Sequence, residues 1–117
     1  MISRELLENM FADMRKKSKW NVDGPLLWGY FFTALDKAKL EAAASALVKD
    51  GYTFVDIWLP ESKESEDSLM WWLHVERVEH HTVDSLHKRN TALYALASKF
   101  GLESYDGMDV GPAAKLA

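Results

Sequence analysis

The stretch that decides the fold of this chain is Trp71-Trp72-Leu73-His74-Val75-Glu76-Arg77-Val78. Successive side chains of a β-strand point to opposite faces. One face of this predicted strand carries Trp71, Leu73 and Val75. The other carries Trp72, His74 and Glu76. The first set is apolar and predicts packing against a core. The second is aromatic and ionisable, which core packing alone would not require, so it is the first candidate for a functional surface.

Composition places the chain among soluble globular proteins. Its 117 residues are enough for one domain with a core of its own, and 48% hydrophobic with 27% charged residues excludes overall disorder. The absence of cysteine excludes disulfides and thiolate metal sites and is typical of a reducing compartment. No apolar run approaches the roughly 20 residues of a membrane span, and the first residues lack the pattern of a signal peptide. We therefore expect a cytoplasmic protein without membrane contact.

The charge balance bears on the partner. Fourteen basic and eighteen acidic residues give a net charge of −4. Proteins that bind nucleic acid usually carry a basic stripe. The basic cluster of this chain, residues 15–19, lies at the end of the first predicted helix, where it complements the helix dipole. The balance favours a basic protein partner over direct nucleic-acid binding.

Periodicity and end signals predict three helices and four strands. The helices are expected over 3–17, 36–49 and 82–100, with Ser3, Asp36 and Thr82 at their starts and glycine after the last two. Strands are expected over 26–33, 52–59 and 69–78, with a brief fourth strand around Tyr105. Between the second and third strands lies an acidic loop that carries Glu61, Glu64, Glu66 and Asp67.

This order, a helix followed by β-α-β-β-α-β, predicts an α+β fold of the ferredoxin-like split sandwich type with an additional N-terminal helix. The predicted units are the N-terminal helix and turn (1–25), the main domain (26–112) and a short tail (113–117). The two later helices would cover one face of the sheet. Strand alternation assigns to the other face Phe54, Asp56 and Trp58, the set Trp72, His74 and Glu76, and either Trp28, Tyr30 and Phe32 or their alternates. A monomer rarely exposes so aromatic a face, so the N-terminal helix, a second copy of the chain or a protein partner should cover it.

Catalytic and metal chemistry have weak support. The histidines at 74, 80, 81 and 87 show no metal-ligand spacing, and the 80–82 segment is expected to be a solvated corner that caps the last helix. His74 and Glu76 could form an acid–base pair, but no nucleophile elbow or phosphate loop accompanies them. We expect no enzyme activity, no metal and no cofactor. The alternative is a dimeric α+β barrel that binds or converts a small molecule, with His74 and Glu76 lining its cavity.

Asn90 lies on the apolar side of the last predicted helix. A buried Asn must hydrogen-bond. We expect it to hold the backbone of the turn formed by Tyr105, Asp106 and Gly107.

Several short motifs are similar to those of a known family. Ala97-x-Lys99-Phe100 followed by Tyr105-Asp106-Gly107 resembles the closing signature of the RraB family, the regulators of ribonuclease E activity B. His87-x-x-Asn90-x-x-Leu93-Tyr94 and Lys49-Asp50-Gly51-Tyr52 resemble its earlier segments in order and spacing. The resemblance spans about 26–112.

The resemblance implies a ferredoxin-like, non-enzymatic bacterial regulator that binds the basic scaffold region of ribonuclease E and lowers its activity on RNA. The chain departs from that pattern in two respects: it ends without the acidic tail, and its sheet is richer in aromatic residues. We expect partner binding by the acidic loop and by the sheet face that carries Trp58, Trp72, His74 and Glu76.

Overall fold

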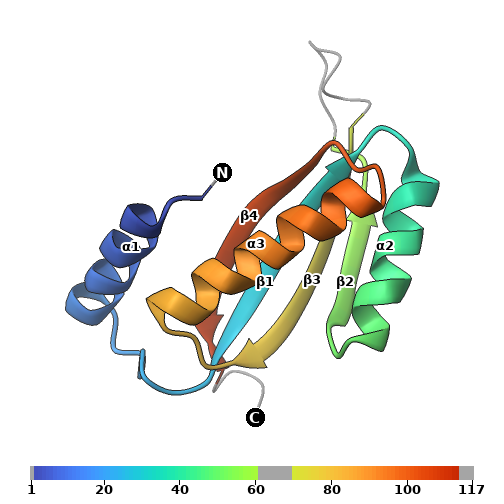
Figure 1. Cartoon of the computed structure of the whole chain (residues 1–117). Coiled ribbons are helices and arrows are strands. Elements are labelled where there is room, and N and C mark those ends of the chain that lie inside the picture. The colour runs from blue at the N-terminus through green and yellow to red at the C-terminus, as the bar shows by residue number, and fades with distance from the viewer. Residues whose placement is uncertain (1, 61–69, 114–117) are drawn as a thin grey trace.

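The structure is a computed structural model that describes residues 2–60 and 70–113. It contains, in chain order, α1 (Arg4–Lys17), β1 (Leu26–Ala34), α2 (Lys37–Lys49), β2 (Thr53–Trp58), β3 (Trp71–Glu79), α3 (Val83–Lys99) and β4 (Ser104–Pro112) (Figure 1). The four strands form one antiparallel sheet in the order β2-β3-β1-β4. The predicted α+β class is thereby confirmed.

Each helix begins where its capping residue predicts. The side chains of Ser3, Asp36 and Thr82 accept hydrogen bonds from the backbone N–H groups of Leu6, Ala38 and Ser85 at 3.1, 2.9 and 3.1 Å. These bonds satisfy N–H groups that the first turn of a helix leaves unpaired. After α2 and α3 the chain turns through Gly51 (φ 101°) and Gly101 (φ 68°), a conformation that favours glycine.

The core lies between the sheet and the two helices α2 and α3. From β1 it takes Trp28, Tyr30 and Phe32, each at most 1% exposed. Leu73 and Val75 of β3 pair with Phe32 and Tyr30 in register and are fully buried beside them. The structure thus settles which side of β1 faces the helices, and it confirms the core-facing role of Leu73 and Val75.

Helix α1 extends the helix layer. Its buried residue Phe11 lies with its ring centroid 6.0 Å from that of Trp28, on the helix-covered side of the sheet. Arg4 pairs with Asp84 of α3, and the N–H of Ile2 donates to the hydroxyl of Tyr94 at 2.9 Å. Because α1 packs beside α3 in this way (Figure 1), it does not cover the opposite face of the sheet.

Two strands differ from their predictions. β4 is not brief: it runs for nine residues and pairs with β1 from Leu26 to Thr33. In β2 a register shift lies between Phe54 and Asp56, which pair with Val75 and His74. This β-bulge puts Phe54 on the helix-covered side, whereas simple alternation had placed it with Asp56 and Trp58.

Candidate protein-binding face

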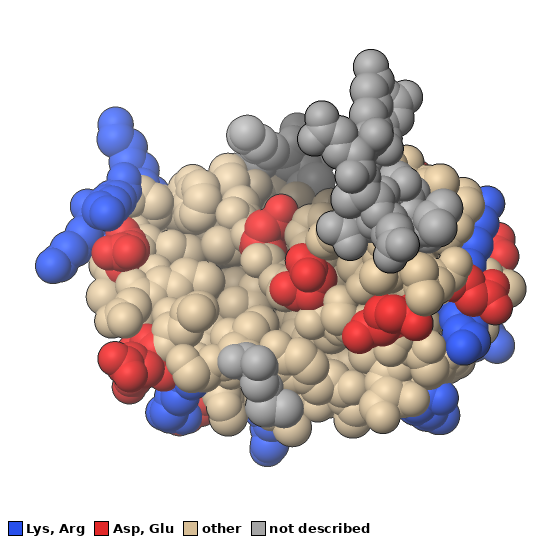
Figure 2. Space-filling view, turned by 90° about the horizontal axis from the view of Figure 1, so that it is seen from above, with Lys and Arg blue, Asp and Glu red and all other residues tan. Residues whose placement is uncertain are grey.

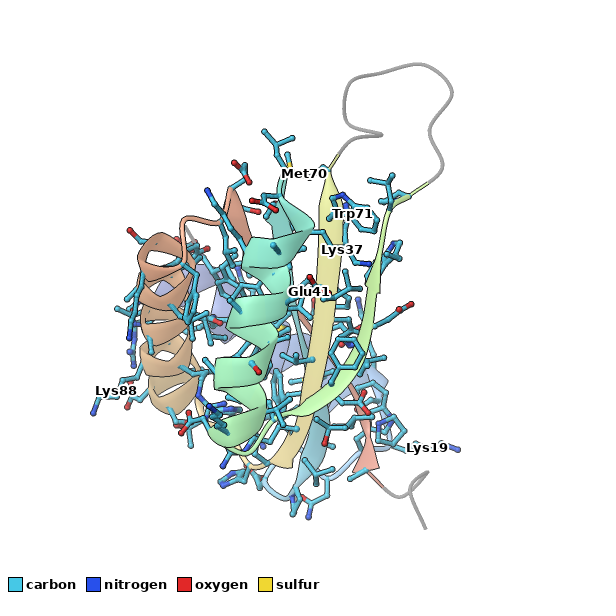
Figure 3. The ribbon with its side chains drawn as sticks, turned by 90° about the vertical axis from the view of Figure 1, so that its right-hand side faces the viewer. Lys19, Lys37, Glu41, Met70, Trp71 and Lys88 are labelled. Carbon is cyan, nitrogen blue, oxygen red and sulfur yellow. The ribbon has the colours of Figure 1, made fainter. Side chains whose placement is uncertain are left out.

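The open face is the side of the sheet that α2 and α3 leave uncovered. Figure 3 shows both helices on one side of the strands. Strand register assigns to the open face Leu27, Gly29, Phe31, Asp56, Trp58, Trp72, His74, Glu76 and Asp109. Four of the predicted site residues, Trp58, Trp72, His74 and Glu76, therefore share one surface.

The aromatic part of the open face consists of two stacked pairs. The rings of Trp58 and Trp72 lie 6.1 Å apart at 22°, and those of Phe31 and His74 lie 4.3 Å apart at 17°. All four side chains are partly exposed. Large rings that are fixed by stacking and still reach solvent are typical anchors of protein interfaces.

The polar part of the open face is built around Gly29. A Cβ atom at this position would run into the carboxylate of Asp109 and would lie 2.7 Å from His74 Nε2. Glycine within a strand commonly marks such a close approach. Glu76, the register partner of Gly29 on β3, adds a second carboxylate. The result is a negatively charged area next to the aromatic pairs.

A hollow of about 180 Å³ lies over Gly29 between Glu76 and Asp109. Pockets that enclose small molecules usually measure roughly 300–1,000 Å³. This hollow is therefore better suited to one side chain of a partner than to a whole substrate. His74 and Glu76, which the sequence offered as a possible acid–base pair, both line this hollow.

The acidic loop residues Glu61, Glu64, Glu66 and Asp67 lie outside the described residues. Among the described residues, basic side chains lie at the outline of the molecule in Figure 2, while acidic side chains also occupy its middle.

Sequence reasoning did not single out four residues of the open face: Leu27, Gly29, Phe31 and Asp109. Gly29, inside an aromatic strand, carried a usable signal for close approach, and Phe31 belonged to the alternate set of β1. Asp109 had no such signal, because the fourth strand was expected to be short.

A partly buried ionic cluster lies on the helix-covered side, where β3 meets α3. Glu79 Oε2 accepts hydrogen bonds from the Tyr30 hydroxyl at 2.6 Å and from Arg89 at 2.7 Å, and lies 2.9 Å from His81 Nε2. Burial raises the pKa of Glu79, but the hydrogen bonds from His81, Tyr30 and Arg89 outweigh it and lower the pKa to about 2. Burial, followed by the hydrogen bond to Glu79, raises the pKa of Tyr30. The expected solvated corner is therefore wrong for His81, which is buried, while Thr82 supplies the cap.

Asn90 is buried, and its Oδ1 accepts a hydrogen bond from the Tyr105 hydroxyl at 2.6 Å. The partner is a side chain of β4, not the loop backbone that the sequence suggested. Burial raises the pKa of Tyr105, so its hydroxyl keeps the proton that it donates. In the same segment Asp106 is exposed, and Gly107 has φ 139°.

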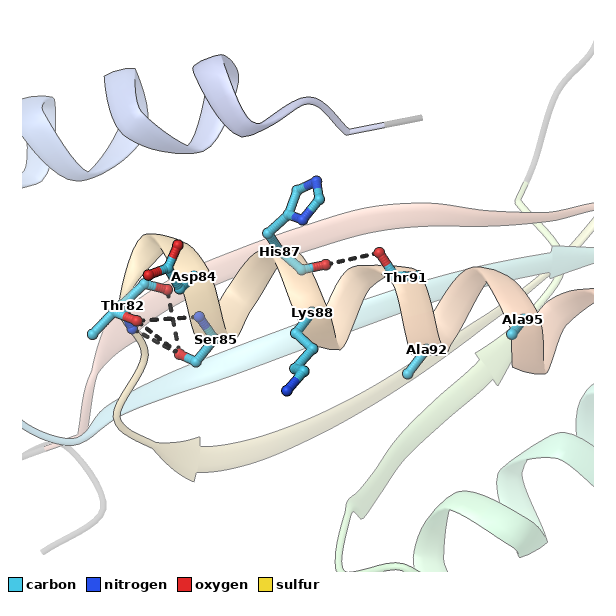
Figure 4. A pocket seen from close by; sticks show the side chains of 8 residues that line it. All are labelled: Thr82, Asp84, Ser85, His87, Lys88, Thr91, Ala92 and Ala95. Atoms are coloured by element: carbon cyan, nitrogen blue, oxygen red, sulfur yellow. Dashed lines mark hydrogen bonds between the residues drawn. The ribbon is translucent and has the colours of Figure 1, made fainter.

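A larger hollow, of about 750 Å³, lies on the outer side of α3, away from the open face (Figure 4). Its lining comes from residues 82–95 alone, so it is a shallow depression along one helix. Three of its polar side chains serve the helix itself: Thr82 and Ser85 form the capping box, and the Thr91 hydroxyl donates to the His87 carbonyl at 3.1 Å. A fourth, Asp84, pairs with Arg4 of α1. We therefore place the candidate site on the open face.

Within residues 2–60 and 70–113, no group of three or more His, Asp or Glu side chains is arranged to hold a metal ion. None of the described helices has the length and apolar character needed to cross a membrane.

The sequence matches the family model RraB, described as "Regulator of ribonuclease activity B", over residues 4–110. The match includes α1 and most of β4 as well as the elements between them. No curated protein matches the chain. Because the family match covers nearly the whole sequence, the chain belongs to the RraB family, a family of regulators of ribonuclease activity.

Proposed function

We propose that this protein is a non-enzymatic, cytoplasmic regulator that binds a ribonuclease directly through the open face, and that the nuclease is ribonuclease E. The observation that carries the proposal is the pairing of Trp58 with Trp72, which are partly exposed next to carboxylates on the sheet face that the described helices leave uncovered. The family match supplies the class of the target.

The chemistry of the open face supports binding to a basic protein segment. Asp56, Glu76 and Asp109 contribute negative charge from three strands. Such charges increase the rate at which a basic partner associates, and buried aromatic side chains then supply most of the affinity. We propose that the acidic residues Glu61, Glu64, Glu66 and Asp67, which follow Trp58 in the sequence, add to this attraction.

We also propose that the domain is ferredoxin-like. The strand order β2-β3-β1-β4, antiparallel throughout, and the element order β-α-β-β-α-β support this assignment.

The test is to add the purified protein to ribonuclease E, follow cleavage of a labelled RNA, and measure binding in parallel. We expect the native protein to bind and to slow cleavage, and Trp72→Ala to weaken binding at least about tenfold, as the loss of an interface anchor does. The matched control is Leu35→Ala, which trims an apolar side chain that is 57% exposed and lies outside the open face.

Equal binding by Trp72→Ala and the native protein would refute the assignment to the open face. A native protein that neither binds nor slows ribonuclease E would refute the target. Reversing Glu61, Glu64, Glu66 and Asp67 to Lys should slow association most at low salt, because screening weakens exposed charges as salt rises.

A further inference from the structure

The outer edge of β2 is an exposed apolar surface. In the described sheet β2 pairs only with β3, so its other side has no strand partner. The described residues include seven exposed large apolar side chains, and four of them lie on or beside this edge: Val48, Phe54, Val55 and Leu59, exposed by 47, 47, 41 and 40%. A hollow of about 430 Å³ separates α2 from β2 here and has Val48, Phe54 and Ile57 in its lining.

The opposite edge of the sheet, β4, is different. It carries the exposed carboxylates Asp106 and Asp109, is interrupted by two glycines and ends in Pro112. Charge and proline at an edge discourage pairing with another strand. β2 has one charged residue, Asp56, and no proline. β2 does have one protective feature, the bulge between Phe54 and Asp56, but it carries fewer charges than β4 and has no proline.

The charged residues beside the β2 edge form a pattern that can pair with the same pattern on a second copy of the chain. Along the side of α2 that borders the hollow, Glu41 lies toward one end, Lys49 toward the other and Ser45 midway between them. A two-fold axis that paired β2 with β2 of a second copy in antiparallel fashion would also set the two α2 helices antiparallel. Glu41 would then face Lys49 of the second copy, and Lys49 would face its Glu41. An isologous interface needs this self-complementarity.

We propose that two copies of this chain associate through their β2 edges, forming one continuous sheet with α2 of each copy on the same side. Val48 and Phe54 of one copy fill the hollow of the other, and the two Glu41–Lys49 pairs fix the register. Figure 3 looks onto this edge, with α2 and β2 toward the viewer. The open face stays accessible in this dimer, so the proposal is independent of nuclease binding.

The test uses charge reversal and exploits the two-fold symmetry. Glu41→Lys alone and Lys49→Glu alone each turn two attractive contacts into repulsive ones, and each should weaken the dimer roughly tenfold. An equimolar mixture of the two variants should recover the native affinity, because every Lys in one copy then faces a Glu in the other. Molecular mass is measured by sedimentation or light scattering across a concentration series. Lys88→Glu, an exposed reversal on α3, is the control and should leave the mass unchanged.

Circular dichroism checks that both variants fold, which is expected because Glu41 and Lys49 are exposed. A native protein that stays monomeric throughout the concentration series would overturn the proposal. So would a dimer that survives both reversals, or a mixture that fails to regain the dimer that each variant had lost.

Discussion

At position 29 only glycine fits without moving side chains of the open face. The Cβ of any other residue would displace Asp109 and His74 Nε2. The φ angle of Gly29 is not positive, so the backbone itself accepts other residues there. Glycine is required here by side chains of the neighbouring strands and not by the backbone conformation of β1. We therefore expect a substitution to change the open face more than the stability of the protein.

We predict that Gly29→Ala weakens binding of the partner several-fold while leaving the urea midpoint close to that of the native protein. The added methyl group pushes the Asp109 carboxylate into solvent and displaces the His74 ring from its stacking on Phe31. Neither side chain belongs to the buried core, so the cost in stability is small. The matched control is Gly111→Ala, on β4 beside the same hollow, where an added Cβ meets nothing within 4 Å. Comparable loss of binding in both variants would argue against a role for the Gly29 contact.

Glu79 should make the stability of the protein depend on pH in the acid range. Its pKa falls from 4.5 to about 2 on folding, which corresponds to about 3 kcal/mol of stability. A lowered pKa stabilises the folded state fully above the unfolded value. This contribution is therefore present above about pH 4.5 and is lost as the pH falls toward 2.

We predict that Glu79→Gln lowers the free energy of unfolding by about 2–3 kcal/mol at pH 7, because it removes the charge that Tyr30, His81 and Arg89 bind. The difference between the variant and the native protein should shrink as the pH falls from 4.5 toward 2. Urea unfolding at a series of pH values measures it. A difference that stays constant over that range would show that the carboxylate charge is not what stabilises the cluster.

At the level of the elements, the helices follow their local sequence, and β4 depends on a tertiary contact. The caps Ser3, Asp36 and Thr82 act within their own first turns, so each start could be predicted from a few neighbouring residues. β4 has two glycines and few apolar residues, and its local pattern predicted only a short strand. Pairing along β1 and the bond from Tyr105 to Asn90 fix it in place.

We predict that Asn90→Leu and Tyr105→Phe each destabilise the protein by about 1–3 kcal/mol, because each leaves a buried polar group without its partner. The double variant Asn90→Leu with Tyr105→Phe removes both groups. Its loss in free energy of unfolding should be clearly smaller than the sum of the losses of the two single variants. A double-mutant cycle by urea unfolding gives the coupling. Strictly additive costs would mean that this hydrogen bond does not fasten β4 to α3.

At the scale of the whole molecule, α1 is part of the same core as the sheet. Leu7, Phe11 and Met14 are buried together with residues of β1 and α3, and Phe11 contacts Trp28. The sequence predicted the helix and its apolar side but left its place open, since an amphipathic helix can pack on either face of a sheet. The structure places it beside α3.

We predict that Phe11→Ala lowers the free energy of unfolding by about 3 kcal/mol, as large-to-small changes in a core do. The backbone amide hydrogens of α1 should also exchange faster in this variant than in the native protein. The control is Leu6→Ala on the same helix, where the side chain is 52% exposed and the cost should be small. If both variants unfold at the same urea concentration, α1 is not held by the core.

The sequence by itself determined the class of fold, the order of its elements, the helix starts and the aromatic–ionisable face of the third predicted strand. These features follow from the periodicity of side chains and from capping, which act over a few residues. Only the tertiary structure decided the side on which α1 packs, the bulge that moves Phe54, the length of β4, and the meeting of Gly29 with Asp109 and His74. These depend on strand register and on contacts between residues far apart in the chain, which a local pattern does not encode.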